Sequence, residues 1–570
     1  MAKNKLENVD LKLNVSNLGI TKVEIGELTK KMEKFNITPT IALDKFAFAL
    51  KKINPNALVP LDKLPTDVKI SLENLKNETR SFHGAKISLS WFPFPMVSSP
   101  CSDKFGYLTS STVRQSSKLD FNIITIGLMN QLGNLMGASG RDSTISDSII
   151  PSGYTYFGQF VDHDVTLDVS SNIDVSTDAT TINNMRSPRL DLDNVYGRGP
   201  ALDPHLYEFP SAGPSTAIKL KLGKNTNTGS GGPSTSGGGS GGMSIKLNAD
   251  VPRVEGTNTA IIGDPRNDEN LIVSQIQMTM LKFHNAVVDL VTISNLSGGF
   301  DGDIFIEAKK IVTQHYQWAV VNDYLVRICG ASTVTTSLSS VVAPIDSAFS
   351  MPVEFSVAAY RFGHSIIRDN YWVTHNLINR PLSEIFSFIR KPNLPVNSNW
   401  VIDFNAFFDT GVVVPVNNKA RKIDSVLSSG LSAIPGLAVT LASRNLRRGL
   451  AMGLPSGQAT ATALGITPMT PAQLTSGLQP DELTILNSNG GLLLTKTPLW
   501  YYILREAAVL SNGNTLGPVG GKIVADTFIK MLKRDSESYL NKVGGFSPFL
   551  SPSGVFTVAD IIKFAGVNVP

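Results

Sequence analysis

The sequence predicts a mainly α-helical protein with little β-structure. From about residue 86 onward, apolar side chains recur every three or four residues, the spacing of one face of a helix. Alternating patterns typical of strands are short and scattered. The chain has 570 residues, 42% of them hydrophobic and 17% charged, so it can bury a large apolar interior.

The chain is expected to divide into an extension and a main domain. Residues 1–85 mix one helical pattern, VEIGELTKKMEKF, with turns such as NPNALVP, and their role is not indicated by any motif. Residues 86–570 carry the helical periodicity. Within them, residues 228–242 consist almost entirely of Gly, Ser and Thr, which cannot bury enough surface to become ordered. We expect a flexible loop there. A linker between domains is the alternative, but the motifs described below lie on both sides of it.

Three long helical patterns follow one another in the main domain. The clearest is NLIVSQIQMTMLKFHNAVVDLV, in which one apolar stripe is formed by Ile272, Ile276, Met280, Phe283 and Val287. Similar stripes occur in DIFIEAKKIVTQHYQWAVVNDYLVRICG and in GKIVADTFIKMLKRDSESYL. We expect each of these helices to pack against a common core.

Charge and apolar content exclude several classes of protein. The formal net charge is +4, too small for this length to indicate nucleic-acid binding or a polybasic membrane anchor. No stretch approaches the about 18 consecutive apolar residues of a membrane span. The first residues, MAKNKLENVDLKLNV, lack the apolar segment of a signal peptide. This favours a cytoplasmic location, with secretion by a signal-peptide-independent route as the alternative. Cys101 and Cys329 are expected to be reduced, because two distant cysteines make no disulfide framework.

Two of the seven histidines have neighbours that suggest chemistry. His163 stands between Asp162 and Asp164 in FGQFVDHDVTLD, which is typical of a metal site or of a polar turn. His364 lies among polar and aromatic residues in AAYRFGHSIIRDNYW. For either residue by itself, a hydrogen-bonded structural role is the simpler interpretation, and His284, inside the first apolar stripe, is also expected to be structural. No zinc motif is present.

Five segments, taken together and in order, resemble the animal-type haem peroxidase family. They are similar to its distal-haem motif (GQFVDHD), calcium loop (LDLDNVYG), distal-arginine segment (GDPRNDENLIVSQIQMTMLKFHN), proximal-histidine segment (YRFGHSIIR) and the element that supports that histidine (RNLRRGLAMGLPSG). Each match is weak singly, but five in register are specific. The resemblance implies a large haem peroxidase-like helical fold, with residues 86–570 as the catalytic domain. The lack of a disulfide framework makes the chain more similar to bacterial members.

The resemblance implies a distal group of residues that cleaves hydrogen peroxide. His163 would take the proton from the near oxygen and return it to the leaving oxygen, which suits an imidazole of near-neutral pKa. Arg266 would stabilise the negative charge that gathers on the separating oxygen. Gln159 would hydrogen-bond water or a halide above the iron. Without the resemblance, Arg266 in the charged run DPRNDEN would be interpreted as a surface arginine.

On the other face of the haem, the resemblance implies His364 as the axial ligand of the iron. Asn445 matches the residue that bonds the other ring nitrogen of this histidine. A neutral amide withdraws less proton character from the ring than a carboxylate would, so the iron should be more oxidising. Arg361 and Arg448 match positions that pair with the haem propionates, whereas their simpler interpretation is that of exposed helical arginines.

The resemblance also implies a calcium site beside the distal histidine. Ca²⁺ prefers six to eight oxygen ligands. Implied ligands are the side chains of Asp164, Ser187, Asp191 and Asp193, with backbone carbonyls such as that of Arg189. Such an ion would tie His163 to the LDLD loop. The alternative is that LDLDN is a turn with solvated acids.

Two acids bear on covalent attachment of the cofactor, haem b. Asp162 and Glu269 match the positions at which mammalian members form ester links to haem methyl groups, so the same links are candidates here. Asn270 replaces the methionine of the chloride-oxidising member, which argues against chloride oxidation.

The predicted function is that of a haem-dependent peroxidase, with a role in the response to oxidative stress. It would reduce hydrogen peroxide and, through a ferryl intermediate, oxidise a phenol, a halide or thiocyanate. A fatty-acid dioxygenase of the same superfamily is one alternative. It needs a tyrosyl radical three residues before the proximal histidine, where this chain has Arg361, and Tyr360 is turned away by about 100°. The second alternative is a non-catalytic haem- or calcium-binding protein, but such a protein has no need of both His163 and Arg266.

Overall fold

The chain divides into two units, Met1–Ser98 and Ser99–Pro570. In the first unit, β1 (Thr79–Phe82) pairs antiparallel with β2 (Ala85–Ser88). The helical pattern expected within residues 1–85 and the Gly/Ser-rich segment 228–242 lie outside the described residues, and a domain boundary after residue 85 stays a prediction. The computed structural model describes residues 79–82, 85–88, 104–141, 146–225, 249–296, 302–387, 395–432, 439–551 and 555–567.

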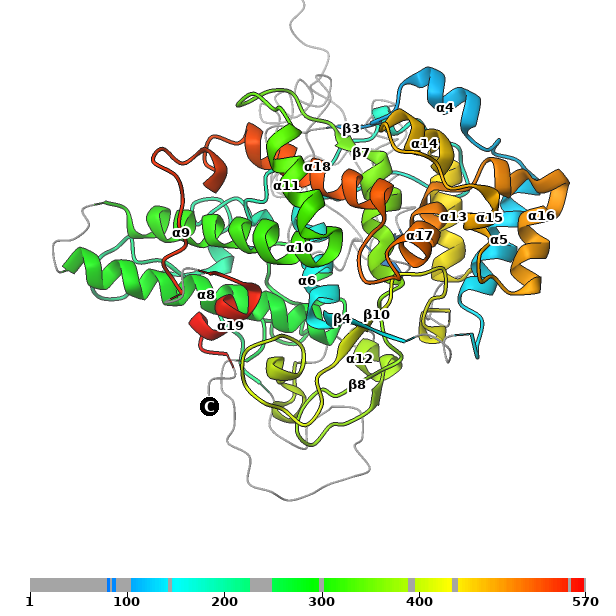
Figure 1. The fold of residues 1–570 in the computed structure, drawn as a ribbon. Helices are drawn as coiled ribbons and strands as arrows, with labels where there is room; N and C mark the ends of the chain where they lie inside the picture. Colours follow the sequence, from blue (N-terminus) through cyan, green and yellow to red (C-terminus); the bar gives the residue numbers. More distant parts are fainter. Residues whose placement is uncertain are drawn as a thin grey trace, which may run out of the picture. The chain divides into compact units, whose positions relative to one another are not determined.

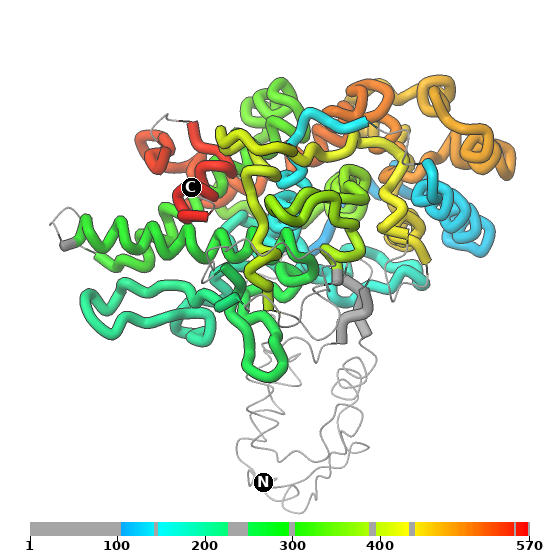
Figure 2. The backbone as a smooth tube through the Cα atoms, turned by 90° about the horizontal axis from the view of Figure 1, so that it is seen from below, coloured from blue at the N-terminus to red at the C-terminus, as the bar shows by residue number. Residues whose placement is uncertain are grey.

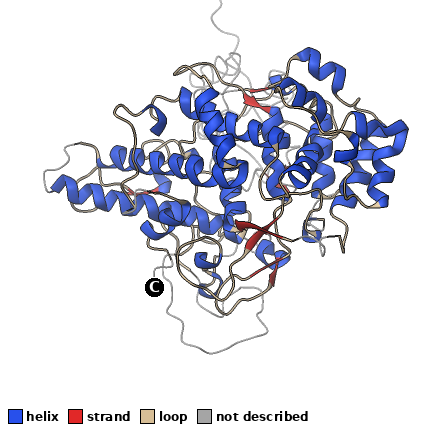
Figure 3. Ribbon diagram, viewed as in Figure 1, coloured by secondary structure: helices blue, strands red, loops and turns tan. Residues whose placement is uncertain are grey.

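Helices form most of the second unit, which confirms the predicted fold class (Figure 1, Figure 3). Its α-helices are α4 (Ser111–Ser117), α5 (Ile123–Met136), α6 (Gly153–Val165), α7 (Asp193–Tyr196), α8 (Leu271–Leu296), α9 (Ile304–Ala319), α10 (Leu325–Cys329), α11 (Ala331–Ser340), α12 (Leu382–Ser387), α13 (Leu441–Ala451), α14 (Gly457–Ala463), α15 (Pro471–Leu474), α16 (Pro480–Thr495), α17 (Leu499–Leu510), α18 (Pro518–Arg534) and α19 (Val558–Phe564).

The strands of this unit are short and, among the described residues, pair only in twos. The parallel pair is β3 (Phe105–Gly106) with β7 (Met351–Pro352). The antiparallel pairs are β4 (Asp147–Pro151) with β10 (Lys419–Arg421), β5 (Tyr207–Glu208) with β6 (Lys219–Leu220), and β8 (Asn370–Tyr371) with β9 (Arg380–Pro381). They fasten loops and do not build a sheet core.

The three long helices predicted from apolar stripes are all present. The first pattern forms α8, and its five stripe residues are each at most 5% exposed. The second forms α9, a π-helical turn η8 (Val320–Tyr324) and α10 in direct succession. The third forms α18. The stripes therefore mark real core contacts.

Helix α6 connects two groups of helices. In one group α8 and α9 run side by side, and the C-terminal α19 packs on both (Figure 1, Figure 2). In the other, α5 packs on α13, while α17 contacts α13, α14 and α18. α6 contacts α8 and also the 3-10 turn η10 (Ala359–His364), which itself packs on α17 and α18. Residues on α6 can therefore meet residues from both groups.

Helix α6 is buried along almost its whole length, with Gln159 as the exception. Two glycines permit this close packing. A Cβ at Gly153 would meet the ring of Phe408 at 2.4 Å, and one at Gly158 would meet Oη of Tyr324 at 2.4 Å. Because a buried polar side chain is costly without a partner, the acids and the histidine near the end of α6 require a polar environment.

Two further sequence predictions concern membranes and cysteines. Among the described helices, none has the length and the apolar content needed to cross a bilayer. Cys329 is a buried free thiol, while Cys101 lies outside the described residues.

Candidate haem and cation site

His163 is completely buried on α6 and is oriented by an amide. Its Nδ1 lies 2.7 Å from Oδ1 of Asn267, which belongs to the 3-10 turn η7 (Pro265–Asp268). Nδ2 of Asn267 donates to Oε1 of Gln277 at 2.8 Å, which turns Oδ1 toward the imidazole. Since Oδ1 can only accept, Nδ1 carries the proton and Nε2 is the basic nitrogen. The imidazole is thus held in the tautomer that can accept a proton at Nε2.

Arg266 is buried, at 4% exposure, and is not the surface residue that its charged sequence context suggests. Its Nε and Nη2 donate to the carboxylate of Asp264, the latter at 2.7 Å. Nη2 also donates to the backbone oxygen of His163 at 3.0 Å. The guanidinium therefore lies against the end of α6 that carries the histidine.

Three residues singled out in the sequence, Gln159, Glu269 and Asn270, form one small network. Nε2 of Gln159 donates to the carboxylate of Glu269, and Nδ2 of Asn270 donates to Oε1 of Gln159 at 3.0 Å. The network joins α6 to the start of α8. The predicted halide-binding or water-binding Gln159 thus lies next to the acid predicted to form a haem ester.

His364 and Asn445 meet, although 81 positions separate them in the sequence. His364 ends η10, Asn445 lies on α13, and the side-chain amide of Asn445 is 2.7 Å from Nδ1 of the imidazole. As oriented, Nδ2 of Asn445 donates to Nδ1. A flip of the amide, which exchanges Nδ2 and Oδ1, would let Oδ1 accept from Nδ1–H and leave Nε2 for a metal. A Cβ added at the neighbouring Gly363 would meet no described atom within 4 Å, so there is open space beside the histidine.

The elements that carry the two histidines are joined by an ion pair. Nη1 of Arg361 on η10 lies 3.2 Å from Oδ2 of Asp162 on α6, and Oδ1 of Asp162 accepts from Oγ1 of Thr166 at 2.8 Å. Arg448 on α13 pairs with Asp168. Burial lowers the pKa of Arg448, Asp168 raises it, and the like charge of Arg361 lowers it further. Two neighbouring guanidinium groups suit a ligand that carries carboxylate groups, such as the two propionates of haem.

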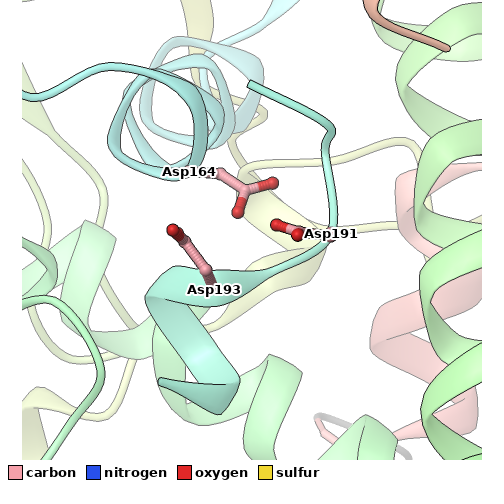
Figure 4. Close-up of side chains that lie close together, drawn as sticks. All are labelled: Asp164, Asp191 and Asp193. Carbon is pink, nitrogen blue, oxygen red and sulfur yellow. The ribbon is translucent and has the colours of Figure 1, made fainter. Parts of the chain in front are cut away.

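Three aspartates converge beside the distal histidine (Figure 4). Asp164 extends from α6, Asp191 from the loop before α7 and Asp193 from the start of α7. Their ligand atoms lie within 4.8 Å of one another. Among the described atoms, Oδ1 of Asp164 and Oδ1 of Asp191 are buried without a hydrogen-bond partner. Burial, and then repulsion by the other two acids, raises the pKa of Asp164 well above its usual range. Burial likewise raises the pKa of Asp193 to about 7. This acidic triad fits a hard cation with oxygen ligands.

The backbone of the loop aims these acids at one point. Leu190 and Leu192 have φ of 55° and 60°, in the left-handed region, and both are completely buried. Each costs about 1 to 2 kcal/mol as a non-glycine residue in that region. The leucines anchor the loop in the core while Asp191 and Asp193 turn toward Asp164.

The two remaining predicted calcium ligands lie at the same loop. The backbone N–H of Ser187 donates to Oδ2 of Asp193 at 3.0 Å. The carbonyl oxygen of Arg189 accepts from Nε2 of Gln317 at 3.4 Å, and its guanidinium pairs with Asp535 at 3.4 Å.

Sequence reasoning missed three residues that hold the distal group in place: Asn267, Asp264 and Arg186. Asp264 and Asn267 flank Arg266, but a run such as DPRND is typical of a solvated turn, so only the fold reveals that it is buried. Arg186 precedes the predicted calcium loop and is 5% exposed, with its guanidinium on Asp264 and Asp193. The signal available in the sequence was their adjacency to predicted site residues.

Solved structures of peroxidases and dioxygenases have a similar fold. Peroxidase A from Dictyostelium discoideum aligns with a TM-score of 0.52 and 17% identity, covering 84% of this chain and 96% of that chain. The Oryza sativa fatty acid alpha-dioxygenase aligns with a TM-score of 0.53 and 15% identity, covering 89% of each. At such identities the likeness defines the fold, the large helical one that both groups of proteins have.

The family follows from the sequence. The model of the animal haem peroxidase family matches residues 174–547, so the chain belongs to this family, and membership implies haem binding. The chorion peroxidase of Drosophila melanogaster is 25% identical over 302 residues, covering 50% of this chain and 35% of that protein. The peroxidasin homolog pxn-2 of Caenorhabditis elegans is 24% identical over 299 residues, covering 50% of this chain and 21% of that protein. The chain thus matches only about a third or less of the length of these relatives.

Proposed function

We propose that this chain is a haem-dependent peroxidase that reduces hydrogen peroxide and oxidises a small donor such as a phenol, a halide or thiocyanate. The observation that carries the proposal is the buried His163, with Nε2 as its basic nitrogen, on a helix that an ion pair joins to the segment bearing His364. A bound haem would supply the iron that accepts peroxide and the redox equivalents that pass to the donor.

On the distal side, each residue has one task. His163 receives the peroxide proton at Nε2 and passes it to the leaving oxygen. Arg266, fixed by two hydrogen-bonded contacts to Asp264, places a permanent positive charge beside the oxygen that gains negative charge. Gln159 orients water or a halide through its amide.

On the proximal side, His364 would coordinate the iron through Nε2, with Asn445 holding Nδ1. Arg361 and Arg448 would bind the propionates. Asp162 and Glu269 are the candidates for ester links. Because they already contact Arg361 and Gln159, each acid would exchange a polar partner for the haem methyl.

We further propose that the acidic triad binds Ca²⁺, with Ser187 and the carbonyl of Arg189 contributing further oxygens. The unpartnered oxygens of Asp164 and Asp191 support this assignment. The ion would hold Asp164, the residue next to His163, against the loop that carries Asp191.

The test starts with the absorption spectrum of the haem-loaded protein before and after acid–acetone extraction. A Soret band establishes haem binding, and pigment that survives extraction establishes covalent attachment. Peroxide-dependent oxidation of guaiacol or bromide is then measured in His163→Ala and Arg266→Ala. With haem retained, we expect rates lower by about 10²–10⁴-fold for the histidine and about 10²–10³-fold for the arginine. The exposed His375, changed to Ala, is the control and should keep the wild-type rate. Unchanged turnover in both site variants would contradict the assigned roles.

Fatty-acid dioxygenation is the second candidate, because a fatty acid alpha-dioxygenase has a similar fold. Against it, the residue three positions before His364 is Arg361, which contacts Asp162. Tyr360 instead packs in an aromatic cluster, with its ring 4.8 Å from that of Phe355 and 5.3 Å from that of Phe528. Oxygen consumption with a polyunsaturated fatty acid and no added peroxide distinguishes the two, since only a dioxygenase consumes oxygen.

A further inference from the structure

We propose that Asp264 is a positioning residue for Arg266, and that it is the central link of a ring of buried charges through which a cation at the acidic triad fixes Arg266. This proposal rests on the proposed function, because it concerns how that site is held in place.

One half of the ring runs from the triad to Asp264. Nη1 of Arg186 lies 3.2 Å from Oδ1 of Asp193. Nη2 of Arg186 donates to Oδ2 of Asp264 and, at 3.3 Å, to the backbone oxygen of Gly263. One guanidinium thus bridges the calcium loop and the turn that carries the distal arginine.

The other half of the ring runs from Asp264 back to the triad through Arg266 and His163. Oδ2 of Asp264 also accepts from Nη2 of Arg266 at 2.7 Å, so one carboxylate oxygen serves two arginines. Nη2 of Arg266 donates to the backbone oxygen of His163 at 3.0 Å. His163 directly precedes Asp164, the third member of the triad. A covalent step along α6 therefore returns this half to the triad, where a cation between Asp164 and Asp193 would close the ring.

Burial makes the part of the ring around Asp264 sensitive to each member, whereas the side chain of Asp193 is 18% exposed. Asp264 is 0% exposed, Arg186 is 5% and Arg266 is 4% exposed. Burial alone would raise the pKa of Asp264, but the two guanidinium groups hold it below its usual range. Charges with so little water around them interact strongly, and removal of one leaves its partner buried and uncompensated.

The charge count indicates what completes the ring. The three triad acids and Asp264 bring four carboxylates, against the two guanidinium groups of Arg186 and Arg266. Two negative charges remain, which is the charge that one divalent cation neutralises. With the cation bound, Asp193 is fixed and holds Arg186, so Asp264 keeps its orientation toward Arg266. Without it, no ion ties Asp193 to Asp164, so Arg186 can move with Asp193, and Asp264 no longer holds Arg266 in one place.

Cyanide binding to the haem-loaded protein reports on this coupling without turnover. Hydrogen cyanide gives its proton to the distal base and leaves the anion beside Arg266, so its affinity depends on both residues. The dissociation constant is measured from the Soret shift with Ca²⁺ and after chelation with EGTA. In the wild type, we expect chelation to weaken cyanide binding by about tenfold, within the usual range of coupling between two sites.

The Asp264→Asn variant should lose this dependence, with less than about a twofold effect of chelation. Asp323→Asn is the matched control, because Asp323 is also buried and paired with an arginine, Arg327, outside the ring. It should respond as the wild type does. Should Asp264→Asn fail to fold, Arg186→Lys tests the same link, since an ammonium lacks the planar fork that bridges two carboxylates.

Calorimetric Ca²⁺ titrations with and without cyanide provide the second measurement. Because coupling is reciprocal, cyanide should tighten Ca²⁺ binding in the wild type by the same factor, and should not do so in Asp264→Asn. Equal responses of the wild type and Asp264→Asn, in proteins that bind both haem and Ca²⁺, would overturn the ring while the proposed function stands. A wild type without a Soret band would overturn both.

Discussion

In the proposed haem site, the contact between Asn445 and His364 would set how strongly this imidazole donates to iron. Replacing the amide by a carboxylate, in Asn445→Asp, pulls the Nδ1 proton and makes the ring more imidazolate-like. We expect the Fe(III)/Fe(II) reduction potential to fall, measured by spectroelectrochemistry of the haem-loaded protein. Asn487→Asp, at an exposed position on α16, adds the same charge away from the site and should leave the potential unchanged. A potential that does not move in Asn445→Asp would argue against His364 as the ligand.

Asp191 distinguishes a cation site from a turn with solvated acids. Its Oδ1 is buried without a hydrogen-bond partner among the described atoms and lies beside the carboxylates of Asp164 and Asp193. Asp191→Asn should weaken Ca²⁺ binding by at least about tenfold, roughly 1.4 kcal/mol. After chelation, the same variant should be more stable than the wild type, because the repulsion is relieved. Thermal unfolding with and without Ca²⁺ checks this reversal of sign. A variant with no effect in either condition would support the solvated turn.

At the scale of elements, the apolar stripe of α8 helps to attach the C-terminal α19, which also packs on α9. Phe283 is completely buried, with its ring 5.8 Å from that of Phe564 and 6.3 Å from that of Phe556. Phe283→Ala should lower the free energy of unfolding by about 3–5 kcal/mol, measured by denaturant titration. Ile293→Ala, on the same helix but 67% exposed, should change it by less than about 0.5 kcal/mol.

The start of α18 contains a pH-dependent contact. Glu506 on α17 accepts from the backbone N–H groups of Val519 and Gly520, at 2.9 and 3.2 Å, and burial raises its pKa from 4.5 to about 7. In this interval the folded protein holds a proton that the unfolded chain releases. The stability contributed by this group is therefore complete below about pH 4.5 and is lost as the pH rises through about 7.

Glu506→Gln keeps an acceptor but cannot ionise. Relative to the wild type, the free energy of unfolding of this variant should increase between about pH 4.5 and 7, by up to about 3 kcal/mol. Denaturant titrations at several pH values measure the difference. Glu537→Gln, at an exposed position, controls for the substitution itself, and a flat difference for Glu506→Gln would contradict the assignment.

The sequence predicts helices better than it predicts how they end. The stripe from Ile272 to Val287 identifies α8, because burial on one face imposes the helical period. The π-helical turn η9 (Glu354–Ala358) and the 3-10 turn η10 before His364 were not predicted, since a few residues have no distinguishable period. The roles of Asp264 and Asn267 could not be predicted either, because a polar run becomes a buried network only when other segments cover it.

At the scale of the whole molecule, the candidate site is built from segments far apart in sequence. The predicted distal group comes from α6 and η7, the acidic triad from α6, the loop before α7 and the start of α7, and the predicted proximal pair from η10 and α13. No local piece of the chain contains the full set, which is why five short motifs together identify the family although each by itself is weak.

This spacing has a consequence for synthesis on the ribosome. All charged members of the ring lie between Asp164 and Arg266, so they leave the ribosome before His364 and Asn445. Asn445 leaves the ribosome later, by roughly 9 to 36 s at the usual rate of 5–20 residues per second. The residues proposed to hold a cation thus emerge first, whereas the residues proposed to hold the porphyrin are all present only after most of the protein has emerged.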